Sequence, residues 1–425
     1  MKTFSRCVIA AIALLALDVL AGSVETTRPE RVGMSEQQLE RLHSRLQQMV
    51  DDEASAGFQI LVSRHGRVVM HRNYGVTDIE SRTPVTDDTL YRIYSMTKPV
   101  VAVAMMVLYE EGKYSLQDPV AKYIPEFEGA KVFAGVDDAG EMILEDALRP
   151  PTIHDLLQHT AGLSYGIFSD TPVDKLYRES AIFDTDRPLK ELIAELASMP
   201  LLFQPGTEYH YSLGVDVQGY LIEVLSGMDA ETFVRKRVLE PLGMDETSAW
   251  VAPEKASLLT RVHTHDEAGQ LVVYEDDPES KFQTSHALRK PIAFSGGAQL
   301  IATGDDYWRF AQMLLNGGEL DGVRILSPTT VELMTSNRFP ESIAGRRFAP
   351  GQGHGFNLVV VTDNTLIPYP ISNGEFSHGG LATTFFWADP ELDLVVVLLN
   401  QYLPWSNPPY IDLIHRMVRA AVIAE

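Results

Sequence analysis

The stretch from Tyr91 to Gly112, YRIYSMTKPVVAVAMMVLYEEG, constrains the fold of this chain more than any other part of the sequence. After Pro99 it is apolar on every side of a helix, and a helix without a polar face has to be buried in the protein. Proline is tolerated in a first helical turn, and glycine is a typical helix end. The sequence therefore predicts a central buried helix with Ser95 at its N-terminus.

Ser95 and Lys98 form the only Ser-x-x-Lys of the chain. Three residues make about one helical turn, so the two side chains are expected on one face. A helix N-terminus favours developing negative charge, and a lysine in an apolar site has a lowered pKa and can act as a base. The pair is typical of a nucleophile beside its activator, although a serine N-cap beside a solvated lysine leaves the same pattern.

The whole chain has 425 residues, of which 45% are hydrophobic and 22% charged, an ordinary composition for a globular enzyme with a large core. Its net charge of −23 disfavours nucleic acid and anionic lipid surfaces as partners.

Residues 1–22 contain Lys2 and Arg6, an apolar run from Cys7 to Leu17 and small residues after it. This order is typical of a signal peptide, so we expect export to the periplasm or the medium. The apolar run is too short for an uncleaved membrane anchor, and we expect no membrane span in the mature chain. Cys7 is the only cysteine, so the mature chain would contain no disulfide.

Strand patterns occur near both ends of the chain. Residues 58–75 read as a hairpin that turns at His65 and Gly66, and GFNLVVV, LATTFFWADP and LDLVVVLLN read as strands after residue 290. Helical periodicity predicts further helices at 35–50, 152–159, 189–198, 215–226, 230–239, 303–315 and 409–423.

The order of these elements predicts two domains. Residues 23–112 and 290–425 would together form an α/β (α+β) domain with a sheet built from both chain ends, and residues 113–289 a mostly helical inserted domain.

Several motifs together resemble the serine β-lactamases, penicillin-binding peptidases and related esterases, in particular the class C-like branch. The matching stretches span most of the mature chain in one consistent order: YRIYSMTKP, LLQHTAGL, PGTEYHYSLGVDVQGYLIEVLSG, PLGMDETS, GGAQLIATGDDYWRFAQMLLNGG and SHGG. The resemblance implies the β-lactamase/transpeptidase-like fold, an antiparallel sheet flanked by helices, and catalysis without a metal or an organic cofactor.

Carried over to this sequence, the resemblance places the family's nucleophile on Ser95, its lysine on Lys98 and its tyrosine on Tyr211. It implies that Tyr211 shares a proton with the other two, serves as the general base for acylation and later activates water. Three groups that exchange a proton in this way titrate as a unit.

The family's third motif falls on His378, Gly379 and Gly380, which would bind substrate at the edge of the sheet. The resemblance implies an oxyanion hole formed by the backbone N–H groups of Ser95 and Leu381. A glycine pair in a tight turn is the alternative explanation of this motif.

Two departures from the family pattern concern the substrate. Members that cleave β-lactams or D-Ala-D-Ala peptides usually have asparagine two residues after the tyrosine, where this chain has Leu213, and they commonly have Lys-Thr-Gly where His378 stands. Without that lysine the carboxylate of such substrates loses a fixed cation. The chain therefore resembles the carboxylesterase-like members most, with a class C-like β-lactamase or D-alanyl-D-alanine peptidase as the alternative and a non-catalytic cell-wall-binding protein as a second one.

Ser164 offers a competing nucleophile, because GLSYG fits the G-x-S-x-G elbow and Ser164 precedes Asp363 and His378 in the order of an α/β-hydrolase triad. That elbow needs a strand before its serine, whereas TIHDLLQHT reads as a helix.

The pairs His154/His159 and His263/His265 lack the H-E-x-x-H pattern of a zinc site, and we expect no metal. A small-molecule ester is the expected partner, and the sequence leaves the oligomeric state open.

Overall fold

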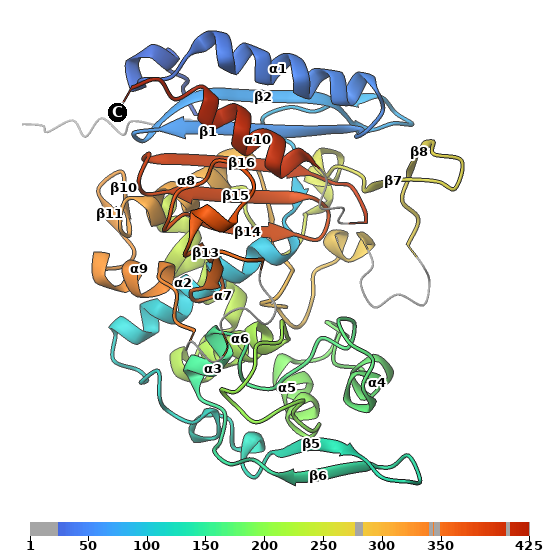
Figure 1. The fold of residues 1–425 in the computed structure, drawn as a ribbon. Helices are drawn as coiled ribbons and strands as arrows, with labels where there is room; N and C mark the ends of the chain where they lie inside the picture. The colour runs from blue at the N-terminus through green and yellow to red at the C-terminus, as the bar shows by residue number, and fades with distance from the viewer. Residues whose placement is uncertain (1–23, 277–283, 340–342, 344–348, 405–408, 425) are drawn as a thin grey trace, which may run out of the picture.

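The computed structural model describes residues 24–276, 284–339, 343, 349–404 and 409–424. The predicted signal peptide, at residues 1–22, lies outside the described residues. The main sheet has eight strands in the order β12-β13-β14-β15-β16-β1-β2-β3, and every adjacent pair is antiparallel. The predicted antiparallel sheet from both chain ends is confirmed, since β16 lies beside β1 (Figure 1).

The strands of this sheet have the bounds β1 Gly57–Arg64, β2 Arg67–Asp78, β3 Thr83–Pro84, β12 Gln352–His354, β13 Val359–Val361, β14 Phe376–Gly380, β15 Thr384–Asp389 and β16 Leu394–Asn400. Shorter two-stranded pairs are β4 Tyr91–Arg92 with β9 Ile301–Ala302, β5 Lys131–Val136 with β6 Met142–Asp146, β7 His263–His265 with β8 Leu271–Val273, and β10 Glu319–Leu320 with β11 Val323–Arg324.

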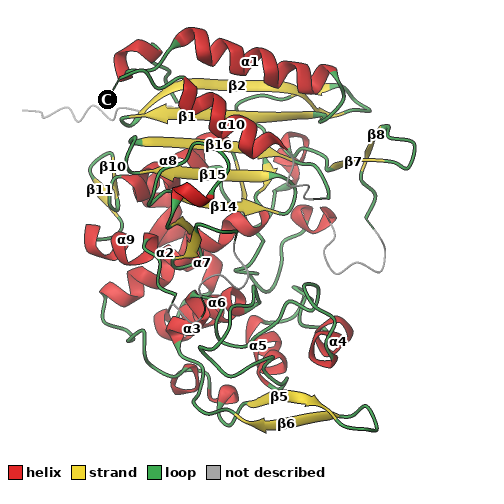
Figure 2. Cartoon of the chain, in the orientation of Figure 1, coloured by secondary structure: helices red, strands yellow, loops and turns green. Residues whose placement is uncertain are grey.

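The α-helices are α1 Glu36–Asp51, α2 Thr97–Glu110, α3 Ile153–Leu157, α4 Pro172–Glu179, α5 Leu189–Ala197, α6 Gly214–Ser226, α7 Ala230–Val234, α8 Gly304–Leu315, α9 Pro328–Thr335 and α10 Pro409–Ala420. They follow the predicted helices closely, with α4 and α9 in addition (Figure 2). None of the described helices is both long and apolar enough to cross a membrane.

Helices cover both faces of the main sheet. Apolar side chains of α1 and α10 pack on one face, and α2 and α8 lie on the other (Figure 1). Because strand side chains alternate, Ile60 and Val62 of β1 join the cluster under α1, whereas Leu61 between them joins the cluster that includes α2. A strand buried on both faces is apolar throughout, which explains why β1 and β16 read as apolar runs in the sequence.

The predicted central helix is α2, and it is buried as expected. Every residue from Thr97 to Leu108 is buried. One detail differs: the helix begins after Ser95, and its N-cap residue, Met96, makes no side-chain cap. Ser95 lies in a short 3-10 turn, Tyr94–Met96, that leads from β4 into the helix.

The inserted region contains a hairpin that the sequence analysis missed. Strands β5 and β6 pair below the helices in Figure 1, although this region was expected to be mostly helical. Most side chains of β6 are exposed, so its sequence lacks the alternation by which a half-buried strand is recognised.

Candidate active site

Ser95 and Lys98 lie together at the start of α2. The Lys98 Nζ donates to Ser95 Oγ over 3.2 Å and to the carbonyl oxygen of Gly297 over 2.6 Å. The first bond follows from the one-turn spacing of the two residues. The second fixes the amine from a different segment, so the position of Lys98 depends on tertiary structure as well as on the helix.

Burial changes the proton affinity of Lys98. Its side chain is fully buried, and desolvation lowers the pKa to about 7, with Asp216 acting in the opposite direction. An amine with such a pKa is substantially neutral near pH 7 and can accept a proton.

Tyr211 completes this group. Its ring centroid lies 4.5 Å from the Lys98 Nζ, and its hydroxyl is hydrogen-bonded to Ser95. Burial raises the pKa of Tyr211 far above its ordinary value, although the bond to Ser95 lowers it in part. Near neutrality Tyr211 therefore carries its proton.

The third predicted motif lies on β14, beside the turn that holds Ser95. A Cβ on Gly380 would collide with the carbonyl oxygen of Ile93 and with Thr384 Oγ1, so only glycine fits there. His378 is buried, and its ring centroid lies 6.4 Å from that of Tyr211. Leu381 is 44% exposed just beyond the strand. The structure thus brings the motif close to Ser95, while the oxyanion role of the Ser95 and Leu381 amides stays a prediction.

His378 is neutral in this position. Its Nδ1 lies 2.8 Å from the carbonyl oxygen of Gly379, which requires the proton on Nδ1. Burial and, to a smaller extent, the nearby Lys98 lower the pKa of His378 to about 3. The side chain cannot provide the positive charge that a substrate carboxylate would need.

Asp216, Gly297 and Tyr165 also belong to this site, although they are not among the residues predicted from the sequence. The Asp216 carboxylate is buried beside Lys98 and accepts a hydrogen bond of 2.7 Å from Ser295 Oγ. A Cβ on Gly297 would lie 2.8 Å from Tyr165 Oη and 2.9 Å from Asp216 Oδ2. Only Asp216 could have been recognised from the sequence, because it lies in the otherwise apolar first turn of α6 and aspartate is rarely buried without a partner.

Ser164 is not arranged as a nucleophile. It is fully buried, and its Oγ donates to Asp174 Oδ1 over 2.5 Å while it accepts from the amide of Gly166. The element before it is helix α3, as expected, not the strand that a nucleophile elbow requires.

The histidines singled out in the sequence do not gather into a metal site. His159 packs against Tyr211, with ring centroids 4.8 Å apart, and its Nδ1 accepts from the amide of Ser212. Over the described part of the chain, no three His, Cys, Asp or Glu side chains are placed to hold a metal ion.

Comparison with known proteins agrees with this geometry. The family description Beta-lactamase matches residues 42–415, which include Ser95, Lys98, Tyr211 and His378. The chain belongs to the beta-lactamase family. Membership accounts for the order of the motifs along the chain and for the sheet that both chain ends build.

Similar members of the beta-lactamase family include proteins named as esterases. The chain is 31% identical to Esterase EstB of Burkholderia gladioli over 88% of its length and 93% of that protein. It is 33% identical to Protein Rv1367c of Mycobacterium tuberculosis, over 84% of this chain and 89% of that one. Among solved structures, EstCE1, a hydrolase with promiscuous acyltransferase activity, superimposes with a TM-score of 0.77 at 27% identity, covering 91% of this chain and 98% of EstCE1.

Proposed function

We propose that the protein hydrolyses small carboxylic esters through an acyl-enzyme on Ser95. The observation that carries the proposal is the position of Ser95 Oγ between Tyr211 and the buried amine of Lys98, whose pKa is lowered to about 7. A hydroxyl becomes a nucleophile when a base within hydrogen-bond reach removes its proton. The esterase name of EstB and the hydrolase description of EstCE1 support the same reaction class.

In the acylation step, Ser95 Oγ attacks the ester carbonyl carbon as its proton passes to the Lys98 amine. The amine is the better acceptor, because its pKa is lowered to about 7 whereas burial holds the proton on Tyr211. When the tetrahedral intermediate collapses, the alkoxide leaves and takes the Tyr211 proton, which Lys98 then replaces. The family resemblance implies Tyr211 as the base, whereas the two pKa shifts favour Lys98 as the base and Tyr211 as the proton relay.

Deacylation repeats these steps with water in place of serine. Water attacks the acyl carbonyl carbon while its proton passes to Lys98. When the second tetrahedral intermediate collapses, the acid is released and Ser95 Oγ takes back a proton from Tyr211, which Lys98 then replaces. Backbone N–H groups of Ser95 and Leu381 would stabilise the oxyanion in both steps.

A neutral ester suits this site better than an anionic lactam or peptide. His378 is uncharged and Leu213 is an apolar side chain, so neither offers the cation or amide that would bind a carboxylate or polar side chain. β-Lactamase or D,D-peptidase activity remains the second candidate, and a binding protein without catalysis the third.

The test is hydrolysis of p-nitrophenyl butyrate by the wild-type protein, Ser95→Ala and Ser164→Ala. Loss of about a thousandfold or more in Ser95→Ala alone is the expected result for removal of a covalent nucleophile. If Ser164→Ala loses ester hydrolysis while Ser95→Ala stays active, the assignment of Ser95 as the nucleophile is wrong. Nitrocefin turnover without ester turnover would favour the lactamase, and no labelling of Ser95 by a fluorophosphonate, which phosphonylates activated serines with loss of fluoride, would favour the binding protein.

We further propose that the protein is exported after removal of about residues 1–22. The basic residues followed by an apolar run and small residues support this. N-terminal sequencing of the protein recovered from the periplasm or medium of an expressing bacterium tests it; an intact Met1 in the cytosol would contradict it.

A further inference from the structure

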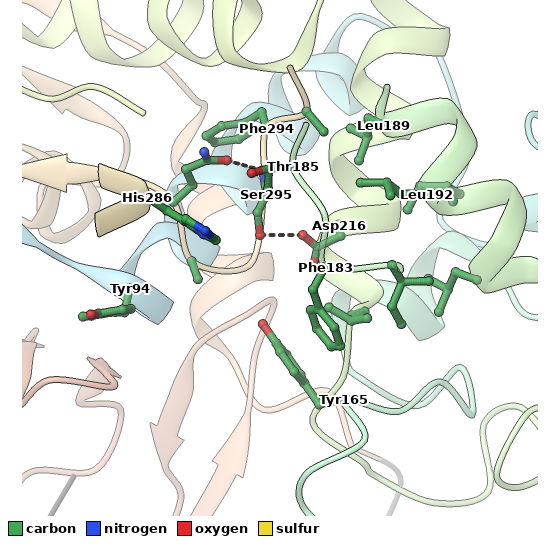
Figure 3. Close-up of a pocket in the computed structure, with 17 residues that line it drawn as sticks. Tyr94, Tyr165, Phe183, Thr185, Leu189, Leu192, Asp216, His286, Phe294 and Ser295 are labelled. Atoms are coloured by element: carbon green, nitrogen blue, oxygen red, sulfur yellow. Dashed lines mark hydrogen bonds between the residues drawn. The ribbon is translucent and has the colours of Figure 1, made fainter. Parts of the chain in front are cut away.

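An apolar cavity lies beside the candidate active site. Its empty space amounts to about 890 Å³, counted together with its opening to solvent. The apolar lining comes mainly from α5 and two neighbouring loops: Phe183, Leu189, Leu192, Ile193, Leu196 and Phe294 (Figure 3). No step of the mechanism above uses these residues.

Two aromatic side chains connect the wall of the cavity to the candidate catalytic group by direct contact. Tyr165 stacks on Tyr211 with ring centroids 5.8 Å apart, and it also stacks on Phe183 with ring centroids 6.2 Å apart. Tyr165 and Phe183 both line the cavity, so the cavity begins one ring away from Tyr211. Asp216, which lies close to Lys98, also lines it.

Two hydrogen bonds join polar side chains and an amide of the cavity wall to one another. Ser295 Oγ donates to Asp216 Oδ1 over 2.7 Å, and the Ser295 amide donates to Gln299 Oε1 over 2.6 Å. Figure 3 shows both bonds on one side of the cavity, with Leu189 and Leu192 on another. On the side of α5 a ligand therefore meets apolar side chains, while Thr185 and His286 add polar atoms elsewhere in the wall.

The apolar wall is long and regular. Leu189, Leu192, Ile193 and Leu196 follow the i, i+3, i+4, i+7 spacing of one helix face, and each is at most 4% exposed. From the first to the last of them α5 rises about 10 Å. A space lined by such an apolar helix face binds hydrocarbon better than it binds water.

We propose that this cavity binds the acyl chain of the ester, and that the preferred substrates are esters of medium-length aliphatic acids. The inference rests on the proposed function, because it needs an acyl group on Ser95. The acyl half suits a recessed site, since it stays bound through both steps, whereas the alcohol has to leave and water has to enter. Each methylene that moves from water into the apolar cavity is worth about a fourfold gain in affinity.

Chain-length profiles test the proposal. We would measure kcat/KM for p-nitrophenyl esters from acetate to dodecanoate with the wild-type protein, Leu192→Phe and Leu192→Ala. The wild-type value should rise at least tenfold from acetate to its optimum. Leu192→Phe fills the cavity and should move the optimum to a shorter chain, while Leu192→Ala enlarges it and should move the optimum to a longer one.

Two controls make the outcome specific. Leu314→Ala removes an equally buried leucine from α8, away from the cavity, and should leave the profile shape unchanged. Ratios between chain lengths within one variant do not depend on the fraction of folded protein, so partial misfolding does not imitate the effect.

A second substrate series separates the two halves of the ester. If Leu192 variants change the profile of alkyl acetates instead of p-nitrophenyl acyl esters, the cavity binds the alcohol and the acyl assignment is wrong. A flat acyl profile, or one that both Leu192 variants leave unchanged, also overturns it. Absence of Ser95-dependent turnover of every ester would instead refute the proposed function itself.

Discussion

Lys98 is the residue whose protonation should govern activity. Its pKa is lowered from 10.5 to about 7 by burial, so below pH 6 it is charged and cannot accept the Ser95 proton, and above pH 8 it is neutral. We therefore expect kcat/KM for p-nitrophenyl butyrate to rise through pH 7. Lys98→Arg should lose about a hundredfold or more at every pH, because a guanidinium stays protonated. A rise of kcat/KM with its midpoint near pH 10, or an active Lys98→Arg protein, would contradict the assignment of Lys98 as the base.

Asp216 should influence the pH at which kcat/KM rises, which is the limb of the pH profile. Its negative charge raises the pKa of Lys98, in opposition to burial. Asp216→Asn removes this charge, so we expect the limb of the kcat/KM profile to move to lower pH. Asp306→Asn is the control, because burial raises the pKa of Asp306 to about 7 as well, but its carboxyl does not act on Lys98. If Asp306→Asn moves the limb and Asp216→Asn does not, the limb belongs to Asp306.

Gly297 should tolerate no side chain. A methyl group there would lie within 3 Å of Tyr165 Oη and Asp216 Oδ2 and 3.5 Å from Lys98 Nζ. We expect Gly297→Ala to lower kcat/KM at least tenfold while far-UV circular dichroism stays that of the wild type. Gly219→Ala is the matched control, since its methyl would meet no atom closer than 3.5 Å. Wild-type activity in Gly297→Ala would show that the contacts around Lys98 are not needed for turnover.

The candidate site was only partly predictable at the residue scale. Ser95 and Lys98 are three residues apart, so helix geometry alone placed them together. Tyr211 and His378 required the family resemblance, because their distance from Ser95 along the chain carries no geometric information. Gly297 was not found, since its role consists of a carbonyl oxygen and a missing side chain, and neither has a sequence pattern.

At the scale of elements, the periodic segments were predicted and the exposed ones were not. The turn at His65 and Gly66 was read correctly, and both residues have the positive φ that a tight hairpin requires. Helices α1, α5 and α6 each begin within one residue of the expected start. The hairpin β5–β6 was missed because solvent exposure removed the hydrophobic pattern on which strand prediction depends.

Helix α10 is held on the sheet by buried charges. Arg419 donates to Glu375 and Asp389 over 2.5 Å each, and both carboxylates are at most 2% exposed. Arg419→Ala leaves two buried carboxylates without their cation, and we expect it to lower the free energy of unfolding by about 3–5 kcal/mol.

Chemical denaturation measures this change, with Arg416→Ala as the control. Arg416 belongs to the same helix but pairs with Asp412 at the surface, so its loss should cost less than about 1 kcal/mol. Equal effects of the two substitutions would show that the buried pairs contribute nothing beyond a surface pair.

At the scale of the whole molecule, the sheet cannot form before the chain is complete. Strand β1 pairs with β2 on one side and with β16 on the other. The N-terminal hairpin therefore gains its second neighbouring strand only when residues 394–400 are present. Such long-range pairing slows folding, and it makes the two chain ends a single cooperative unit. The described part of the inserted region contributes no strand to this sheet and instead provides Tyr211, Asp216 and most of the apolar lining of the cavity.

This division predicts opposite outcomes for two deletions. Residues 135–142 form the exposed end of the β5–β6 hairpin, where Val136 is 51% exposed, whereas Val132 and Phe133 hold its base to Leu201. Replacing residues 135–142 by Asn-Gly should leave the thermal midpoint within a few degrees of the wild type, because little buried surface is lost.

Removing residues 409–425 should instead abolish cooperative unfolding. The deletion exposes the sheet face on which Tyr410, Ile414 and Val418 pack over Trp387 and Val396, and it leaves Glu375 and Asp389 unpaired. Calorimetry of the two variants measures both effects, and esterase activity reports whether the site survives. A cooperative transition after loss of α10 would show that the sheet is stable with one face uncovered. A collapsed transition in the hairpin variant would mean that β5–β6, despite its exposure, supports the helices that carry Tyr211.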